Sequence, residues 1–147
     1  MKINCAAVVV AAIVHFLIGG LWYGLIFGNL FLKIVEWTPE QLAQIQAQSH
    51  WTQYLMAFVS SFVLVYILAH FVQYTKADTA LDGILTGFWL WLGFVVTTQL
   101  ASVIFEQRRL GLYLLNVGYQ LTACMICGAI VATWKPRVAT DAVAENA

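Results

Sequence analysis

Four apolar stretches, each long enough to cross a lipid bilayer, occupy most of the chain. They run approximately over residues 3–27, 54–74, 81–105 and 112–134, and no charged residue lies in the middle of any of them. A membrane-spanning helix needs about 20 apolar residues. Each stretch is therefore predicted to form one span, and the chain is predicted to be a multi-pass membrane protein.

The composition excludes a soluble domain. Of the 147 residues, 62% are hydrophobic and 10% are charged, whereas soluble domains carry about 25% charged residues. Four membrane helices account for nearly every residue and leave no room for a separate soluble domain. We predict an all-α, integral membrane four-helix bundle over residues 1–135, followed by a disordered tail over residues 136–147.

Charge and cysteine content exclude several classes of partner. Seven Lys and Arg balance seven Asp and Glu, so no basic surface exists to attract nucleic acid. The odd number of cysteines argues against a disulfide framework. Cys124 and Cys127 form a C-x-x-C pair inside an apolar helix, where thiolates are disfavoured, and are predicted to be packing residues. A metal site prefers four Cys or His ligands, so we predict no metal and no cofactor.

The first span and the connection after it carry specific signals. The span is too long for the core of a signal peptide and ends in Trp22 and Tyr23, so we expect it to be retained. In the connection over residues 28–52, Thr38 is suited to cap a helix and Gln41 to complete a capping box. We predict a short helix there, lying on the membrane surface.

The positive charges in the loops suggest an orientation. The side that holds both termini carries four positive residues, which are Lys2, Lys76, Lys135 and Arg137. The opposite side carries three, which are Lys33, Arg108 and Arg109. The excess favours both termini in the cytoplasm, and we expect the protein in the cytoplasmic membrane of a bacterium. A nearly equal number of positive charges on the two sides is also typical of a dual-topology protein.

Small residues recur at helical spacing on three spans. They are Gly20, Gly24 and Gly28 on the first, Gly83 and Gly87 on the third, and Cys124, Gly128 and Ala132 on the fourth. Such ridges allow helix backbones to approach closely in lipid. Two interpretations stay open: contact between helices of one chain, and the seam of a homo-oligomer through the glycines of the first or third span. Membrane lipids are the other expected partners.

Polar side chains within spans are candidates for function, because burying them costs free energy. His15 falls at the expected middle of the first span, either as a packing residue or as a proton-relay or ligand residue. The other candidates lie mainly in the outer halves of the first, third and fourth spans: Trp22, Tyr23, Trp91, Thr97, Thr98, Glu106, Arg108, Asn116 and Tyr119. These groups form either a ligand pocket or a hydrogen-bond network that only joins the helices.

Three motifs combine residues that are rare in membranes. They are Gly20-Leu-Trp22-Tyr23 with Leu25-Ile-Phe27-Gly28, then Gly87-Phe with Trp91-Leu-Gly93-Phe and Thr97-Thr98, then Phe105-Glu106 with Leu115-Asn116-Val-Gly118-Tyr119. In order and spacing they resemble the DUF1761 family, a group of small four-span membrane proteins of unknown function. The family often has histidine after the tyrosine, where this chain has Gln120. The resemblance implies the fold and leaves the activity open.

The leading hypothesis is a protein that binds or transports a small amphipathic solute or a lipid in an outer-half cavity. In this hypothesis the apolar walls of the cavity are Trp22, Tyr23 and Trp91. The groups that orient the ligand are Thr97, Asn116 and Tyr119, and the gate is formed by Glu106 and Arg108. The alternative is a structural or accessory subunit that oligomerises through its glycine ridges. An enzyme is disfavoured, because no nucleophile elbow, phosphate loop or zinc-binding helix is present in the sequence.

Overall fold

The computed structural model describes residues 3–134, which are helical apart from short turns. Four segments are long and apolar enough to cross a membrane: Cys5–Ile26, Trp51–Tyr74, Ala80–Phe105 and Leu110–Thr133. The predicted all-α class is confirmed. The predicted tail over residues 136–147 and the charges of Lys2, Lys135 and Arg137 lie outside the described residues.

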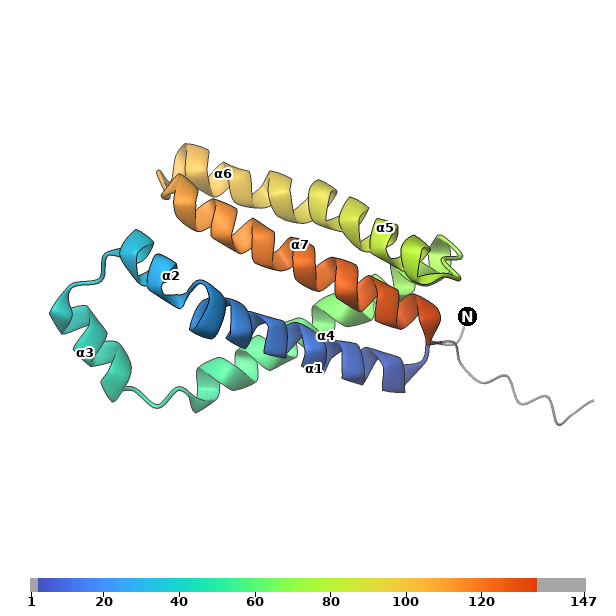
Figure 1. Cartoon of the computed structure of the whole chain (residues 1–147), viewed down its shortest axis with the longest axis horizontal. Coiled ribbons are helices and arrows are strands. Elements are labelled where there is room, and N and C mark those ends of the chain that lie inside the picture. The colour runs from blue at the N-terminus through green and yellow to red at the C-terminus, as the bar shows by residue number, and fades with distance from the viewer. Residues whose placement is uncertain (1–2, 135–147) are drawn as a thin grey trace, which may run out of the picture.

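The elements follow one another as α1 (Cys5–Leu21), η1 (Trp22–Ile26), α2 (Gly28–Val35), α3 (Pro39–Ala47), α4 (Trp51–Tyr74), α5 (Ala80–Leu90), η2 (Trp91–Val96), α6 (Thr97–Phe105) and α7 (Leu110–Thr133). Helix α7 is the centre of the bundle and contacts α1, α4 and α5. Figure 1 shows the α5–α6 span running along α7, with α3 at the end away from the chain's N-terminus. We call the half of the bundle that contains η1, α2 and α6 the distal half.

The first connection contains two helices, of which the sequence predicted one. Helix α3 begins as expected: the Thr38 hydroxyl accepts from the Gln41 amide at 3.2 Å, and the Gln41 side chain accepts from the Thr38 amide at 3.0 Å. This capping box satisfies two backbone donors at the helix start. Helix α2 was not predicted, because it follows the first span after a single non-helical residue, Phe27.

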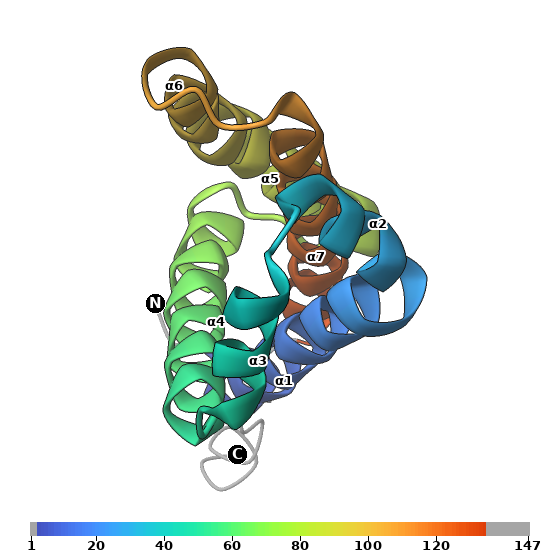
Figure 2. The ribbon, with the colours of Figure 1, turned by 90° about the vertical axis from the view of Figure 1, so that its left-hand side faces the viewer.

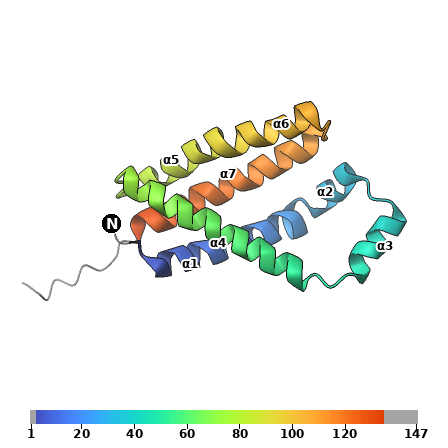
Figure 3. The ribbon, with the colours of Figure 1, turned by 180° about the vertical axis from the view of Figure 1, so that it is seen from behind.

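The apolar core occupies the half of the bundle nearest the termini. It is built from small and branched side chains of α1, α4 and α7, among them Ala11, Val65, Ala69 and Cys127. By contrast, η1, α2, η2 and α6 contain no buried residue. In Figure 3, the view from behind, α4 crosses in front of α1 and α7, and Figure 2 shows α6 set apart from α4. The helices therefore pack less closely in the distal half.

The glycine ridges have different environments. Gly83 lies against the Gly128 carbonyl of α7, and Gly87 lies against the Cys124 carbonyl, so an added Cβ at either position would overlap backbone atoms. These two glycines serve contact within the chain, as the first interpretation holds. Around Gly20 and Gly24 an added Cβ would meet nothing within 4 Å. The predicted oligomer seam on the first span stays a prediction.

Two short π-helical segments interrupt the spans, and neither was predicted. Segment η1 begins at Trp22 in the first span, and η2 begins at Trp91 in the third. A π turn inserts one extra residue into an α-helix and is frequent at functional sites. Both segments coincide with the aromatic motifs singled out in the sequence.

Candidate functional site

His15 is the most deeply buried polar candidate, with 3% of its surface exposed between α1, α4 and α7. Its Nδ1 lies 2.9 Å from the Ser61 hydroxyl oxygen, and that hydroxyl donates to the Ala57 carbonyl at 2.9 Å. A hydroxyl has only one proton to donate, so the Nδ1 proton of His15 donates to Ser61. In the tautomer that fits both bonds, Nδ1 carries the proton and Nε2 is an acceptor.

Tyr119 of α7 closes one side of the imidazole. Its hydroxyl lies 3.2 Å from His15 Nδ1 and 3.3 Å from the His15 carbonyl oxygen. Because Nδ1 already carries a proton, the hydroxyl donates to the carbonyl. The Tyr119 ring also packs at 5.5 Å from the His15 ring and 5.6 Å from the Tyr23 ring, as measured between centroids. Tyr119 therefore joins the mid-span histidine to the aromatic end of the first span.

Two buried acceptors remain without a partner among the described residues. They are His15 Nε2 and Gln120 Oε1, and both residues line the same groove. Two acceptors cannot satisfy each other, and an unpaired buried polar group costs about 1–3 kcal/mol. A hydrogen-bond donor placed between them would satisfy both. Trp22 Nε1 is also buried and unpaired, but Trp22 packs against Gly118 and does not line the groove.

The groove itself lies between α1, η1 and α4, with α7 at its base, and has a volume of about 570 Å³. It is lined by His15, Phe16, Gly19, Gly20, Tyr23, Gly24, Tyr54, Ala57, Ser60, Ser61, Leu64, Tyr119 and Gln120. Polar groups gather at the His15 end, and Phe16 packs edge-on against Tyr54 along the wall. We call this the α1–α4 groove. One side of it is open along the membrane-spanning surface.

The predicted convergence of the first and fourth spans is present. The Tyr23 hydroxyl donates to Asn116 Oδ1 at 2.6 Å, which places both residues beside Tyr119. Trp91 of the third span donates through Nε1 to the Val117 carbonyl at 2.7 Å. Trp91 thus anchors η2 on α7, and its ring lines a separate apolar groove of about 390 Å³ against α4.

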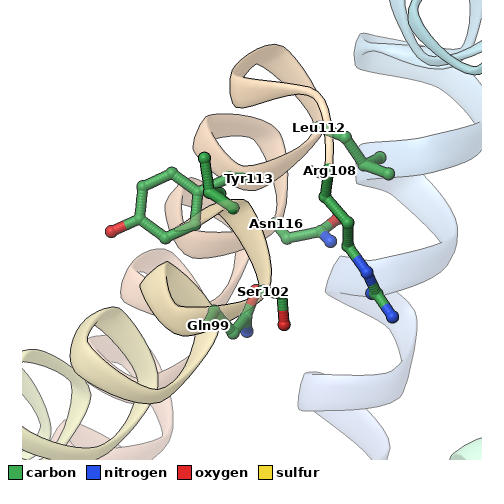
Figure 4. Close-up of a pocket in the computed structure, with 7 residues that line it drawn as sticks. Gln99, Ser102, Arg108, Leu112, Tyr113 and Asn116 are labelled. Carbon is green, nitrogen blue, oxygen red and sulfur yellow. The ribbon is translucent and has the colours of Figure 1, made fainter. Parts of the chain in front are cut away.

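The remaining predicted residues lie apart from the α1–α4 groove. Thr97 and Thr98 are exposed and donate to the carbonyls of Gly93 and Phe94 in their own span. Glu106 and Arg108 form an exposed ion pair at 2.7 Å. Arg108 lines a second, smaller cavity together with Asn116 (Figure 4).

Sequence reasoning missed the contribution of α4. None of the candidate residues came from its span, yet Tyr54, Ser60 and Ser61 line the α1–α4 groove. The available signal was the Ser60-Ser61 pair, which lies in the middle of an apolar run at the depth predicted for His15. Gln120 was noted only as the residue that replaces a family histidine, and it now lies beside His15 in the groove.

A bundle of four apolar helices with polar side chains enclosed between them defines a multi-pass membrane protein. The model of the family described as "Protein of unknown function (DUF1761)" matches residues 6–132, and the chain belongs to this family. The match confirms the resemblance over nearly the whole chain. No curated protein and no solved structure matches it.

Proposed function

We propose that the protein binds a small amphipathic solute or a lipid in the α1–α4 groove, through a hydrogen-bond donor on the ligand. The observation that carries this proposal is the pair of unpaired acceptors, His15 Nε2 and Gln120 Oε1, at the wall of the groove. A hydroxyl, amide or ammonium group supplies the missing donor. The ligand therefore places a polar donor group at the wall formed by His15 and Gln120.

The rest of the groove suits an apolar body. Phe16 and Leu64 line it with hydrocarbon, and Gly20 and Gly24 leave room where side chains would fill the space. Its volume of about 570 Å³ falls within the range of about 300–1,000 Å³ typical of ligand pockets. Because one side is open along the span, a ligand dissolved in the membrane can enter without crossing the headgroup layer.

A purely structural alternative uses the same residues. If the imidazole proton lies on Nε2, it donates to Gln120 Oε1; if instead the Gln120 amide rotates, its NH₂ group donates to Nε2. In either case the two residues only join α1 to α7. Such interhelical bonds average about 0.6 kcal/mol in membrane proteins. The two readings differ in one respect: only the ligand site retains a bound molecule.

Native mass spectrometry of the detergent-extracted protein separates these readings. The wild type is expected to carry a bound molecule, and His15→Phe, which lacks the acceptor, should bind it roughly three- to twentyfold more weakly. His70→Phe is the matched control, because His70 bonds to the Tyr66 carbonyl and does not line the groove. A wild-type chain with no retained molecule, or equal retention by H15F, would overturn the proposal.

A second candidate function is that of a subunit that self-associates through the first span. The open space around Gly20 and Gly24 favours it, because a helix of a second copy can approach the backbone closely there. Crosslinking in native membranes tests this candidate. Dimers that Gly20→Leu abolishes would support it, and monomers alone would count against it.

A further inference from the structure

A second cavity lies between α6 and α7, in the distal half of the bundle (Figure 4). It has a volume of about 240 Å³ and is lined by Gln99, Ser102, Val103, Arg108, Leu112, Tyr113 and Asn116. Its polar lining consists of a cation, two amides and hydroxyl groups, and no carboxylate is among the lining residues. This set of side chains is rich in hydrogen-bond donors.

Arg108 is held in place for an external acceptor. Its Nε donates to Glu106 Oε2 at 2.7 Å, which fixes the plane of the guanidinium. No bond from Nη1 or Nη2 is found among residues 3–134, and the side chain is half exposed. A guanidinium presents a planar fork of N–H groups that matches phosphate oxygens better than a lysine does. Glu106 itself does not line the cavity, and its charge is engaged by Nε.

The side-chain amide of Asn116 offers its NH₂ group to the cavity. Its Oδ1 accepts the hydrogen bond from the Tyr23 hydroxyl at 2.6 Å, so its NH₂ group is left for the cavity. Figure 4 shows the polar ends of Asn116, Ser102 and Gln99 to one side of the Arg108 side chain, while the Tyr113 hydroxyl points away. Residues of α6 and of the first two turns of α7 thus line one hollow.

The position of the cavity along the spans indicates where its ligand lies. Arg108 follows the last residue of α6, Phe105, and precedes the first residue of α7, Leu110. Ends of membrane spans lie at the level of the lipid headgroups. Helix α7 also begins without a side-chain cap, and the positive end of a helix dipole favours anions. Val103 and Leu112 give the cavity an apolar edge.

We propose that this cavity binds a phosphate group, either of a membrane phospholipid or as a free ion, through Arg108, Asn116 and Ser102. The site is separate from the α1–α4 groove, and the proposal does not rest on the function proposed there. Three probes in lipid-depleted detergent solution test it: phosphatidylglycerol, a diacylglycerol that lacks phosphate, and inorganic phosphate. Native mass spectrometry reports the bound lipids, and thermal unfolding reports protection by the ion.

The expected result is one phosphatidylglycerol per chain in the wild type, with affinity about tenfold lower in Arg108→Gln, since that variant loses charge-assisted hydrogen bonds. Lys33→Gln is the charge-matched control, because Lys33 lies on α2 and does not line the cavity; it should bind as the wild type does. Ser102→Ala gives a second, conservative variant with a smaller loss.

The three probes also separate the sources of the phosphate. Protection by inorganic phosphate that R108Q abolishes identifies the free ion as sufficient, whereas binding of phosphatidylglycerol alone identifies the lipid. Equal binding of diacylglycerol and phosphatidylglycerol would overturn the proposal. So would R108Q binding phosphatidylglycerol as tightly as the wild type and K33Q do. A failure here leaves the His15 test unaffected, because the two sets of variants share no residue.

Discussion

The close contact between α5 and α7 predicts opposite effects of one substitution at two glycines. At Gly83, an added Cβ lies against the Gly128 carbonyl and 2.7 Å from the Ala132 Cβ, whereas ordinary contact begins at 3.4 Å. The two helices must separate by more than half an ångström, because the atoms that they meet belong to backbone or to a short side chain. Overpacking of this kind costs about 1–3 kcal/mol, so Gly83→Ala should lower the free energy of unfolding by that amount.

Gly20→Ala is the matched control for this prediction. An added Cβ at Gly20 meets nothing within 4 Å, and alanine is favoured over glycine inside a helix by about 0.5–1 kcal/mol. The variant should therefore be as stable as the wild type or slightly more stable. Equilibrium unfolding in mixed micelles measures both. If Gly83→Ala matches the wild type, or Gly20→Ala loses as much as Gly83→Ala, the inferred difference in packing is wrong.

Three further outcomes follow from single contacts. Tyr23→Phe removes the 2.6 Å bond to Asn116 and should cost about 0.6 kcal/mol; a double-mutant cycle with Asn116→Leu should show coupling, and simple additivity would contradict the bond. Cys5 is exposed and the other two cysteines are buried, so a membrane-impermeant thiol reagent should modify one cysteine per chain. In the predicted orientation the reagent reaches Cys5 from the cytoplasmic side. Modification only from the other side would refute that orientation. Arg109 lies 2.6 Å from Glu36 and holds the pKa of that carboxyl below its usual value. A lowered pKa in the folded state stabilises the fold above the ordinary glutamate pKa, and this stabilisation is lost as the pH falls through the lowered value. Melting curves against pH should therefore show an acid-dependent component that Glu36→Gln lacks.

The sequence was sufficient for those features that depend on local composition. The length of the apolar runs predicted the four spans, and the Thr38 capping box predicted the start of α3. Depth along the spans also placed Tyr23 and Asn116 among the candidates of one layer, and the structure joins these two by a hydrogen bond. Which face of a span points inward was harder to predict, because a helix in lipid is apolar on all sides and shows little periodicity. The role of Ser61 beside His15 was missed for this reason.

The π segments explain why other candidates were misplaced. Each residue advances an α-helix by about 100°, so one inserted residue turns everything after it by that angle relative to a regular helix. Thr97 and Thr98 follow η2 directly, and both are exposed rather than facing the groove with Asn116. Helical spacing alone gives no sign of such an insertion. The sequence therefore places the candidates in one layer along the spans, while the backbone irregularities at Trp22 and Trp91 decide which side chains face one another across it.

The polar layer divides into two sites with different chemistry, and Asn116 shows how. Its Oδ1 is engaged by Tyr23 of the first span, whereas its remaining donors face the cavity beside Arg108. In the α1–α4 groove, the groups without a partner are the acceptors of His15 and Gln120, whereas the lining of the Arg108 cavity is rich in donors. The two sets call for different groups on a ligand, a donor at His15 and an acceptor at Arg108. The choice between a ligand pocket and a simple helix-joining network therefore has to be made separately for each site, by variants that change one and leave the other intact.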